Sequence, residues 1–175
     1  MKYYTEYRSP IGTLIIAAND EAITGIWILG QKYFPYDLID SSMRADFHPL
    51  LQQAAIWLDA YFQGKKPDCS TLKLAPMGTA FQQQVWHQLL KIPYGSTTTY
   101  GAIAKAIAAD HATHYVSSQA VGNAIARNPI MIIIPCHRVI NAKGDLSGYA
   151  GGIATKAQLL SHEKQIDLNQ PLVFL

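Results

Sequence analysis

Short apolar and alternating runs occupy the first third of the chain and predict β-strands. Separated by turn residues, these runs cover positions 3–7, 14–18 and 23–29. Because the links between them are too short for a crossover, we expect an antiparallel meander. Residues 30–43 show no clear period and are predicted to form a loop.

A helical pattern begins after this loop. Apolar residues from Leu50 to Phe62 recur on one helical face, Pro49 suits the first turn, and Gly64 suits the end of the helix. The strands and this helix predict a small α/β scaffold domain, an antiparallel sheet plus one helix, over residues 1–76.

The second predicted domain, residues 77–175, is mostly helical. Helices are expected after Thr79, over residues 100–109, after Ser117 or Ser118, and over residues 155–164. Residues 141–152 hold four glycines and are expected to form a mobile loop or wing. Two short helices packed on a third are typical of a helix-turn-helix, although the same packing is common without DNA. The predicted fold of this domain is winged helix-turn-helix-like.

Composition narrows the class of protein. Hydrophobic residues make up 49% of the chain and charged residues 15%, which excludes wholesale disorder. The longest apolar run in the second half, Ile130–Ile134, is far shorter than the ~20 residues that cross a bilayer, so no membrane partner is expected. Two cysteines are too few for a disulfide framework or a structural zinc site, so we expect a cytoplasmic protein without metal.

Charge permits a polyanionic partner without requiring one. Residues 77–175 contain seven Lys or Arg against four Asp or Glu, whereas the whole chain carries a formal charge of +2. Solvated lysines explain such an excess equally well.

Three residues that can take part in catalysis are adjacent in the sequence, Cys136, His137 and Arg138. A thiol acts as a nucleophile when it is ionised, and a neighbouring imidazole and cation would favour the thiolate. However, a free cysteine beside an isoleucine run is often part of the core. Adjacent side chains of an extended segment also point in opposite directions. The residues alone leave both interpretations open.

The surrounding segments resemble a known family. Asn128-Pro129, the run Ile130–Ile134 and the string Pro135–Ile140 are similar to the active-site signature of the O6-alkylguanine-DNA alkyltransferases, also called methylated-DNA–protein-cysteine methyltransferases. The resemblance extends over most of the chain. Further similar segments are the first hairpin at 9–14, the first helices of the DNA-binding domain at 81–100, the recognition helix at 120–124, the substrate loop at 148–152 and the final helix at 159–163.

This resemblance implies a mechanism. Cys136 would take the alkyl group from O6 of guanine in one displacement, with His137 as the base through a bridging water. Glu163 would hold the imidazole tautomer, although its spacing also fits a helix-end charge. Tyr100 would donate to the leaving purine, and Asn128 would fix the loop before the isoleucine run.

The resemblance also implies double-stranded DNA as the partner, bound through the minor groove with the alkylated base flipped out. Residues expected to contact DNA are Gln119, Ala120, Gly122, Arg127 and Arg138, and those expected to hold the base are Tyr149, Ala150 and Gly151. Gln119 departs from the arginine that is common in the family, which weakens the expected flipping. Ala150 stands where some members have serine, so an O6 contact there would come from the backbone.

A thioether is not displaced by water or ordinary thiols, and no cofactor motif is present. We therefore expect a monomeric, stoichiometric acceptor that reacts once and needs no cofactor, with O4-alkylthymine as a second possible substrate. The alternatives are a damage sensor that binds alkylated bases without transfer, a helix-turn-helix regulator with an inert cysteine, and a cysteine hydrolase.

Overall fold

The computed structural model describes residues 1–111 and 115–164, which divide into two compact units. The first unit comprises Met1–Met77 together with Pro129–Ile133, and the second comprises Gly78–Asn128 and the described residues from Ile134 onward. The division therefore departs from a single cut near residue 76, because five residues of the later sequence pack with the first unit.

The first unit is built on a four-stranded sheet in the order β3-β2-β1-β4. The strands β1 (Lys2–Ser9), β2 (Gly12–Asn19) and β3 (Ile23–Ile28) form the predicted antiparallel meander. A two-residue strand, β4 (Met43–Arg44), adds to β1 in parallel, so the sheet is mixed rather than purely antiparallel.

The segment predicted to be a loop at 30–43 contains a short helix, α1 (Tyr36–Asp40), and the first residue of β4. Leu38 and Ile39 of α1 pack on a buried cluster that includes Ile15 and Trp27 of the sheet. This helix is too short to produce a readable helical period, and its packing rather than its local sequence explains it.

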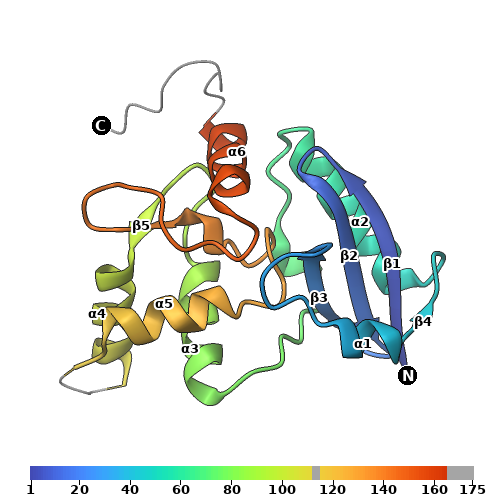
Figure 1. Ribbon diagram of the computed structural model, residues 1–175, viewed down its shortest axis with the longest axis horizontal. Coiled ribbons are helices and arrows are strands. Elements are labelled where there is room, and N and C mark those ends of the chain that lie inside the picture. Colours follow the sequence, from blue (N-terminus) through green and yellow to red (C-terminus); the bar gives the residue numbers. More distant parts are fainter. Residues whose placement is uncertain (112–114, 165–175) are drawn as a thin grey trace. The chain divides into compact units, whose positions relative to one another are not determined.

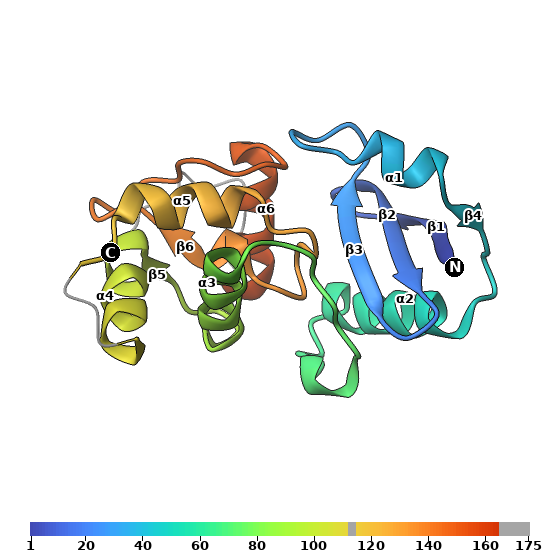
Figure 2. The same ribbon diagram turned by 90° about the horizontal axis from the view of Figure 1, so that it is seen from below.

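The longer helix α2 (Pro49–Phe62) confirms the predicted helical stripe. Its first turn carries Pro49, and Gly64 beyond its end has a φ of 75°, a conformation that glycine adopts without strain. Figure 2 shows α1 and α2 on opposite faces of the sheet. Since side chains alternate along β2, the strand contributes to both layers.

Pro129–Ile133 belongs to the first unit because it pairs with β3. The amide of Ile26 donates to the Pro129 carbonyl at 2.8 Å, and the Met131 amide donates to the Ile26 carbonyl at 3.1 Å. The isoleucine run thus serves as an addition to this sheet edge.

The second unit has the predicted three-helix core. Helices α3 (Ala80–Leu90), α4 (Tyr100–Asp110) and α5 (Ser118–Ala126) pack on one another, with α5 lying across the other two (Figure 1). The indole of Trp86 is buried there and donates to the Ala124 carbonyl at 2.9 Å. Thr79 forms a capping box with Gln82, and Ser117 rather than Ser118 caps α5.

A parallel pairing of two short strands, β5 (Thr98–Thr99) and β6 (Val139–Ile140), brings the start of α4 beside the 3-10 turn η2 (Cys136–Arg138). The last described helix, α6 (Ile153–Lys164), packs against this turn. Residues 141–152 form turns and contain no strand. Among the residues that the structure describes, no helix has the length and apolarity that crossing a bilayer requires.

Candidate active site

The 3-10 turn η2 directs adjacent side chains toward one carboxylate. The Cys136 amide donates to the Ile134 carbonyl at 2.8 Å and the Arg138 amide donates to the Pro135 carbonyl at 3.0 Å, so the chain turns instead of extending. His137 and Arg138 both reach Glu163 of α6. The objection that neighbouring side chains point in opposite directions does not apply, because the segment is not a strand.

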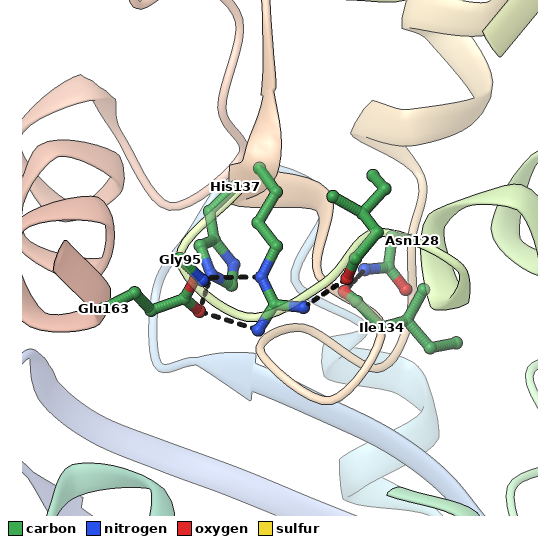
Figure 3. Close-up of polar contacts among 7 residues, drawn as sticks. Gly95, Asn128, Ile134, His137 and Glu163 are labelled. Carbon is green, nitrogen blue, oxygen red and sulfur yellow. Dashed lines mark hydrogen bonds and ion pairs between the residues drawn. The ribbon is translucent and has the colours of Figure 1, made fainter. Parts of the chain in front are cut away.

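Glu163 is the centre of this buried network (Figure 3). The His137 Nε2 lies 2.6 Å from Oε1, and Arg138 donates from Nε to Oε2 at 2.8 Å and from Nη2 to Oε1 at 2.9 Å. The Gly95 amide donates to Oε2 at 3.1 Å. Burial would raise the pKa of Glu163, but hydrogen bonds from His137 and Arg138 outweigh burial and hold that pKa well below its usual range. The group is therefore an ionised carboxylate.

His137 is neutral, and one of its two ring nitrogens faces that carboxylate. Its side chain is fully buried, and burial lowers its pKa against the opposing influence of Glu163. A neutral ring facing a carboxylate through Nε2 carries its proton there and leaves Nδ1 as an acceptor. In the described part of the chain, Nδ1 is buried and has no hydrogen-bond partner. This nitrogen is free to take a proton.

Cys136 is a buried thiol with polar neighbours. Burial raises the pKa of this thiol, while hydrogen bonds from Asn128 and Tyr149 and the charge of Lys156 oppose the rise. The thiol is consequently protonated at rest, and a base must remove its proton during a reaction. The sequence suggested that Arg138 would favour the thiolate of Cys136, but its guanidinium is bound to Glu163 instead.

Asn128 links the two ends of the segment that precedes the thiol. Its Nδ2 donates to the Ile134 carbonyl at 2.8 Å (Figure 3). Its side chain also hydrogen-bonds to Cys136, which acts to lower the pKa of the thiol. Both groups of the Asn128–Ile134 bond are buried, so the bond fixes where the turn η2 begins.

Tyr100 and Lys156 meet at the glycine-rich loop. The Tyr100 hydroxyl and the Lys156 ammonium each donate to the Ser147 carbonyl at 3.0 Å. Burial raises the pKa of Tyr100, and burial lowers the pKa of Lys156 to about 8 even though Cys136 acts in the opposite direction. Sequence reasoning missed Lys156. Its burial could have been predicted from helical spacing. Lys156 lies on the same helical face as Leu159, Leu160 and Glu163, which follow it by three, four and seven residues.

Apart from Arg138, the remaining predicted residues lie in two places, α5 with its C-terminal end and the glycine-rich loop. Gln119 of α5 and Arg127, the residue directly after this helix, are exposed. Ala120 and Gly122 are partly buried, and a Cβ at Gly122 would lie 3.7 Å from the Tyr100 ring. In the glycine-rich loop, Tyr149, Ala150 and Gly151 are all partly buried, and the Tyr149 side chain acts to lower the pKa of Cys136.

Arg138 requires a correction. It was expected to contact DNA, but its side chain is only 10% exposed and is bound to Glu163. Its Nη1 donates to the Ile92 carbonyl at 2.7 Å. A guanidinium whose nitrogens all point into the protein cannot serve as a phosphate contact. Within residues 1–111 and 115–164, no cluster of His, Cys, Asp and Glu is arranged to hold a metal ion.

Comparison with known proteins gives consistent matches over both units. The family model described as "6-O-methylguanine DNA methyltransferase, ribonuclease-like domain" matches residues 2–76, and the model described as the DNA binding domain of the same family matches residues 80–165. A methylated-DNA–protein-cysteine methyltransferase from Methanosarcina acetivorans is 43% identical over 162 residues, which cover 92% of this chain and 97% of that protein. The Mycobacterium leprae protein of the same name is 42% identical over 169 residues, covering 95% of this chain and 94% of that protein.

Solved structures agree. The crystal structure of Mycobacterium tuberculosis O6-methylguanine methyltransferase is 40% identical, covers 97% of both chains and superposes with a TM-score of 0.81. A structure of Mycobacterium tuberculosis OGT in complex with DNA is also 40% identical, with a TM-score of 0.78 over 94% of each chain. Since the sequence matches reach more than 90% of the chain at above 40% identity, the chain belongs to the methylated-DNA–protein-cysteine methyltransferase family.

Proposed function

We propose that this protein repairs DNA by direct reversal, transferring the alkyl group of O6-alkylguanine irreversibly to Cys136. The observation that carries the proposal is the buried thiol on the same turn as a neutral imidazole, whose Nε2 is held by an ionised carboxylate and whose Nδ1 is free. Family membership and the relative bound to DNA support DNA as the partner.

The reaction balances with the groups present. The thiol proton of Cys136 passes through a bridging water to Nδ1 of His137, and the resulting imidazolium is stabilised by Glu163. The sulfur attacks the alkyl carbon, the bond from that carbon to O6 breaks, and its electron pair stays on the purine. The proton released from the thiol finally compensates the purine charge, so that guanine and a thioether are the neutral products.

Tyr100 would stabilise the leaving purine by donating a hydrogen bond as negative charge develops. The raised pKa of Tyr100 suits this role, because it keeps the hydroxyl protonated. When Tyr100 turns to the substrate, the Ser147 carbonyl keeps its bond from Lys156. The loop residues Tyr149, Ala150 and Gly151 would enclose the base.

The DNA is proposed to bind along α5 through its minor groove, with the damaged nucleotide flipped toward the thiol at an expense of a few kcal/mol. The small residues Ala120 and Gly122 permit close approach of the backbone, and exposed Arg127 would contact phosphate. Gln119 would occupy the position left by the base and hydrogen-bond to the unpaired cytosine. The protein would act as a monomer, once per molecule and without a cofactor.

The test is the mass of the intact protein after incubation with a duplex that contains one O6-methylguanine. We expect a gain equal to the replacement of one hydrogen by one methyl group, limited to one per molecule. Cys136→Ser should show no gain, and Cys69→Ser, the same change at the other cysteine, should keep it. Tight lesion binding without a mass change would instead indicate a damage sensor, and neither binding nor transfer would favour the regulator.

A further inference from the structure

Arg138 is bound on three sides inside the protein. Two of its nitrogens hold the two oxygens of Glu163, and the third holds the Ile92 carbonyl. Its guanidinium also lies 5.6 Å from the centre of the Tyr94 ring. A planar guanidinium matches a carboxylate in this two-bond geometry, which fixes both the charge and the orientation of its partner.

We propose that Arg138 is a positioning residue of the transfer reaction, which keeps Glu163 ionised and thereby determines which nitrogen of His137 can accept the thiol proton. This inference rests on the proposed function and adds to it a requirement for one particular cation. It also gives Arg138 a role other than binding DNA.

The physical reason begins with the carboxylate. A buried carboxylate that loses its cationic partner is left as an uncompensated charge, and it responds by taking up a proton. A protonated Glu163 could donate to Nε2 of His137, which would move the ring proton to Nδ1. In that tautomer Nδ1 is no longer an acceptor. The charge of Arg138 therefore selects the tautomer in which His137 is a base for Cys136.

The other charged and titratable groups near this pair do not replace Arg138. Tyr94 is neutral at pH 7, since burial and then the charge of Glu163 raise its pKa. Lys156 weakens the protonation of His137 by its charge but directs its ammonium at the Ser147 carbonyl.

A purely structural role is the competing explanation, because the bond to Ile92 ties the turn η2 to the end of α3. A structural tie would affect folding and the rate at every pH equally. The proposed role predicts a change in pH dependence and in the imidazole tautomer, so these two measurements separate the explanations.

The experiment measures single-turnover methyl transfer from saturating duplex DNA between pH 5.5 and 9, together with the 15N shifts of the His137 ring. For the native protein we expect no rate loss from Glu163 in this range and a proton on Nε2. Arg138→Met should slow transfer on the order of a hundredfold at pH 7, a part of the loss that a wrong tautomer causes in serine protease triads. Its rate should rise with pH as Glu163 loses its proton, and its ring proton should lie on Nδ1.

Three variants complete the design. Arg138→Lys keeps the charge and should retain the Nε2 proton and a flatter pH profile at an intermediate rate. Arg138→Gln removes the charge but keeps a hydrogen-bond donor, and we expect it to behave like Arg138→Met. It takes the place of Arg138→Met if the methionine variant does not fold. Arg44→Met makes the same change in an exposed ion pair with Glu6 and Asp46, and it should leave rate and profile unchanged.

A folded neutral variant that keeps the native pH profile and the Nε2 proton overturns the proposal. The proposal is also overturned if Arg138→Lys and an uncharged variant slow transfer by the same factor at every pH. That result would support the purely structural role. Failure of the function itself is distinguishable, because the native protein would then show no methyl transfer.

Discussion

Replacing Lys156 with methionine is expected to stabilise the second unit while slowing alkyl transfer. The side chain of Lys156 is 1% exposed, and burial lowers its pKa from 10.5 to about 8. The charged ammonium is thus less favourable in the folded than in the unfolded chain. Methionine has a similar length and flexibility and carries no charge, so the substitution removes the desolvated charge without leaving a large cavity.

The size of this stabilisation follows from the difference between the folded and unfolded pKa values of Lys156. At about 1.4 kcal/mol per pKa unit, the buried charge destabilises the fold at pH 7 by about 3 kcal/mol. Against this stands the lost hydrogen bond to the Ser147 carbonyl, worth about 1 kcal/mol, and that carbonyl keeps its bond from Tyr100. The net gain expected for Lys156→Met is about 2 kcal/mol in the free energy of unfolding.

The pH dependence has a definite sign. Because the folded pKa of Lys156 lies below the unfolded value, the unfolded chain binds more protons between pH 8 and 10.5, and the contribution of this group to stability rises with pH in that window. The native protein should therefore gain about 2 kcal/mol between pH 7 and 9.5, which removes the advantage of the variant. Burial raises the pKa of Cys136, and this raised pKa acts against the trend in both proteins.

The assay is urea unfolding followed by helical circular dichroism at pH 7 and pH 9.5, and the quantity compared is the difference between the two proteins at each pH. Lys91→Met, the same change at a lysine whose side chain is 55% exposed, is the control and should alter stability by less than about 0.5 kcal/mol. A destabilised Lys156→Met at pH 7, or an advantage that does not shrink at pH 9.5, would refute the reasoning. Transfer should slow because the charge that favours the Cys136 thiolate is lost.

Three further predictions concern single contacts. Gly25→Ala places a Cβ 1.7 Å from the Trp27 ring, so chemical denaturation should show a loss of about 2 kcal/mol or more, and a loss under about 0.5 kcal/mol would contradict this close approach. Thr79→Ala removes the capping box with Gln82 and should lower the stability of the second unit by about 1 kcal/mol in urea unfolding. Gln119→Arg should tighten duplex binding and steepen its salt dependence in an anisotropy titration, and unchanged affinity and repair rate would exclude the role given to this position.

Much of the fold is readable in the sequence because its signals are local. Alternating apolar and polar residues and short apolar runs predict the strands, and a stripe of apolar residues on one helical face predicts α2. Thr79 and Ser117 predict the starts of α3 and α5, because their side chains accept hydrogen bonds from the first backbone amides of these helices. The pairing of Pro129–Ile133 with β3 carries no such signal, since an apolar run is compatible with burial in either unit. Backbone hydrogen bonds to Ile26 pair this segment with β3, and such a contact between residues far apart in the sequence leaves no local pattern.

The site shows a different limit. Resemblance to a family points to Cys136, His137 and Glu163, and the structure brings these three residues together. The same reasoning took Arg138 for a DNA contact, because a cation without a known partner is expected at the surface. Its burial follows from Glu163, a carboxylate 25 residues later in the chain that no local pattern connects to it. Lys156 was readable from its helical spacing, yet a lysine on a buried face contradicts the usual exposure of that residue type.

If Cys136 is the acceptor, as proposed, the arrangement also explains how a protein that reacts once protects this thiol from other reactions. A cysteine that is ionised at rest reacts with any small electrophile or oxidant, and each such event would permanently remove one acceptor molecule. Here burial keeps the Cys136 thiol protonated, while the neutral His137 holds its accepting nitrogen ready. In the proposed mechanism, loss of the thiol proton leads to alkyl transfer only when an alkyl carbon lies against the sulfur. Specificity then depends on the substrate and the base being at the thiol together, not on a thiol that is reactive by itself.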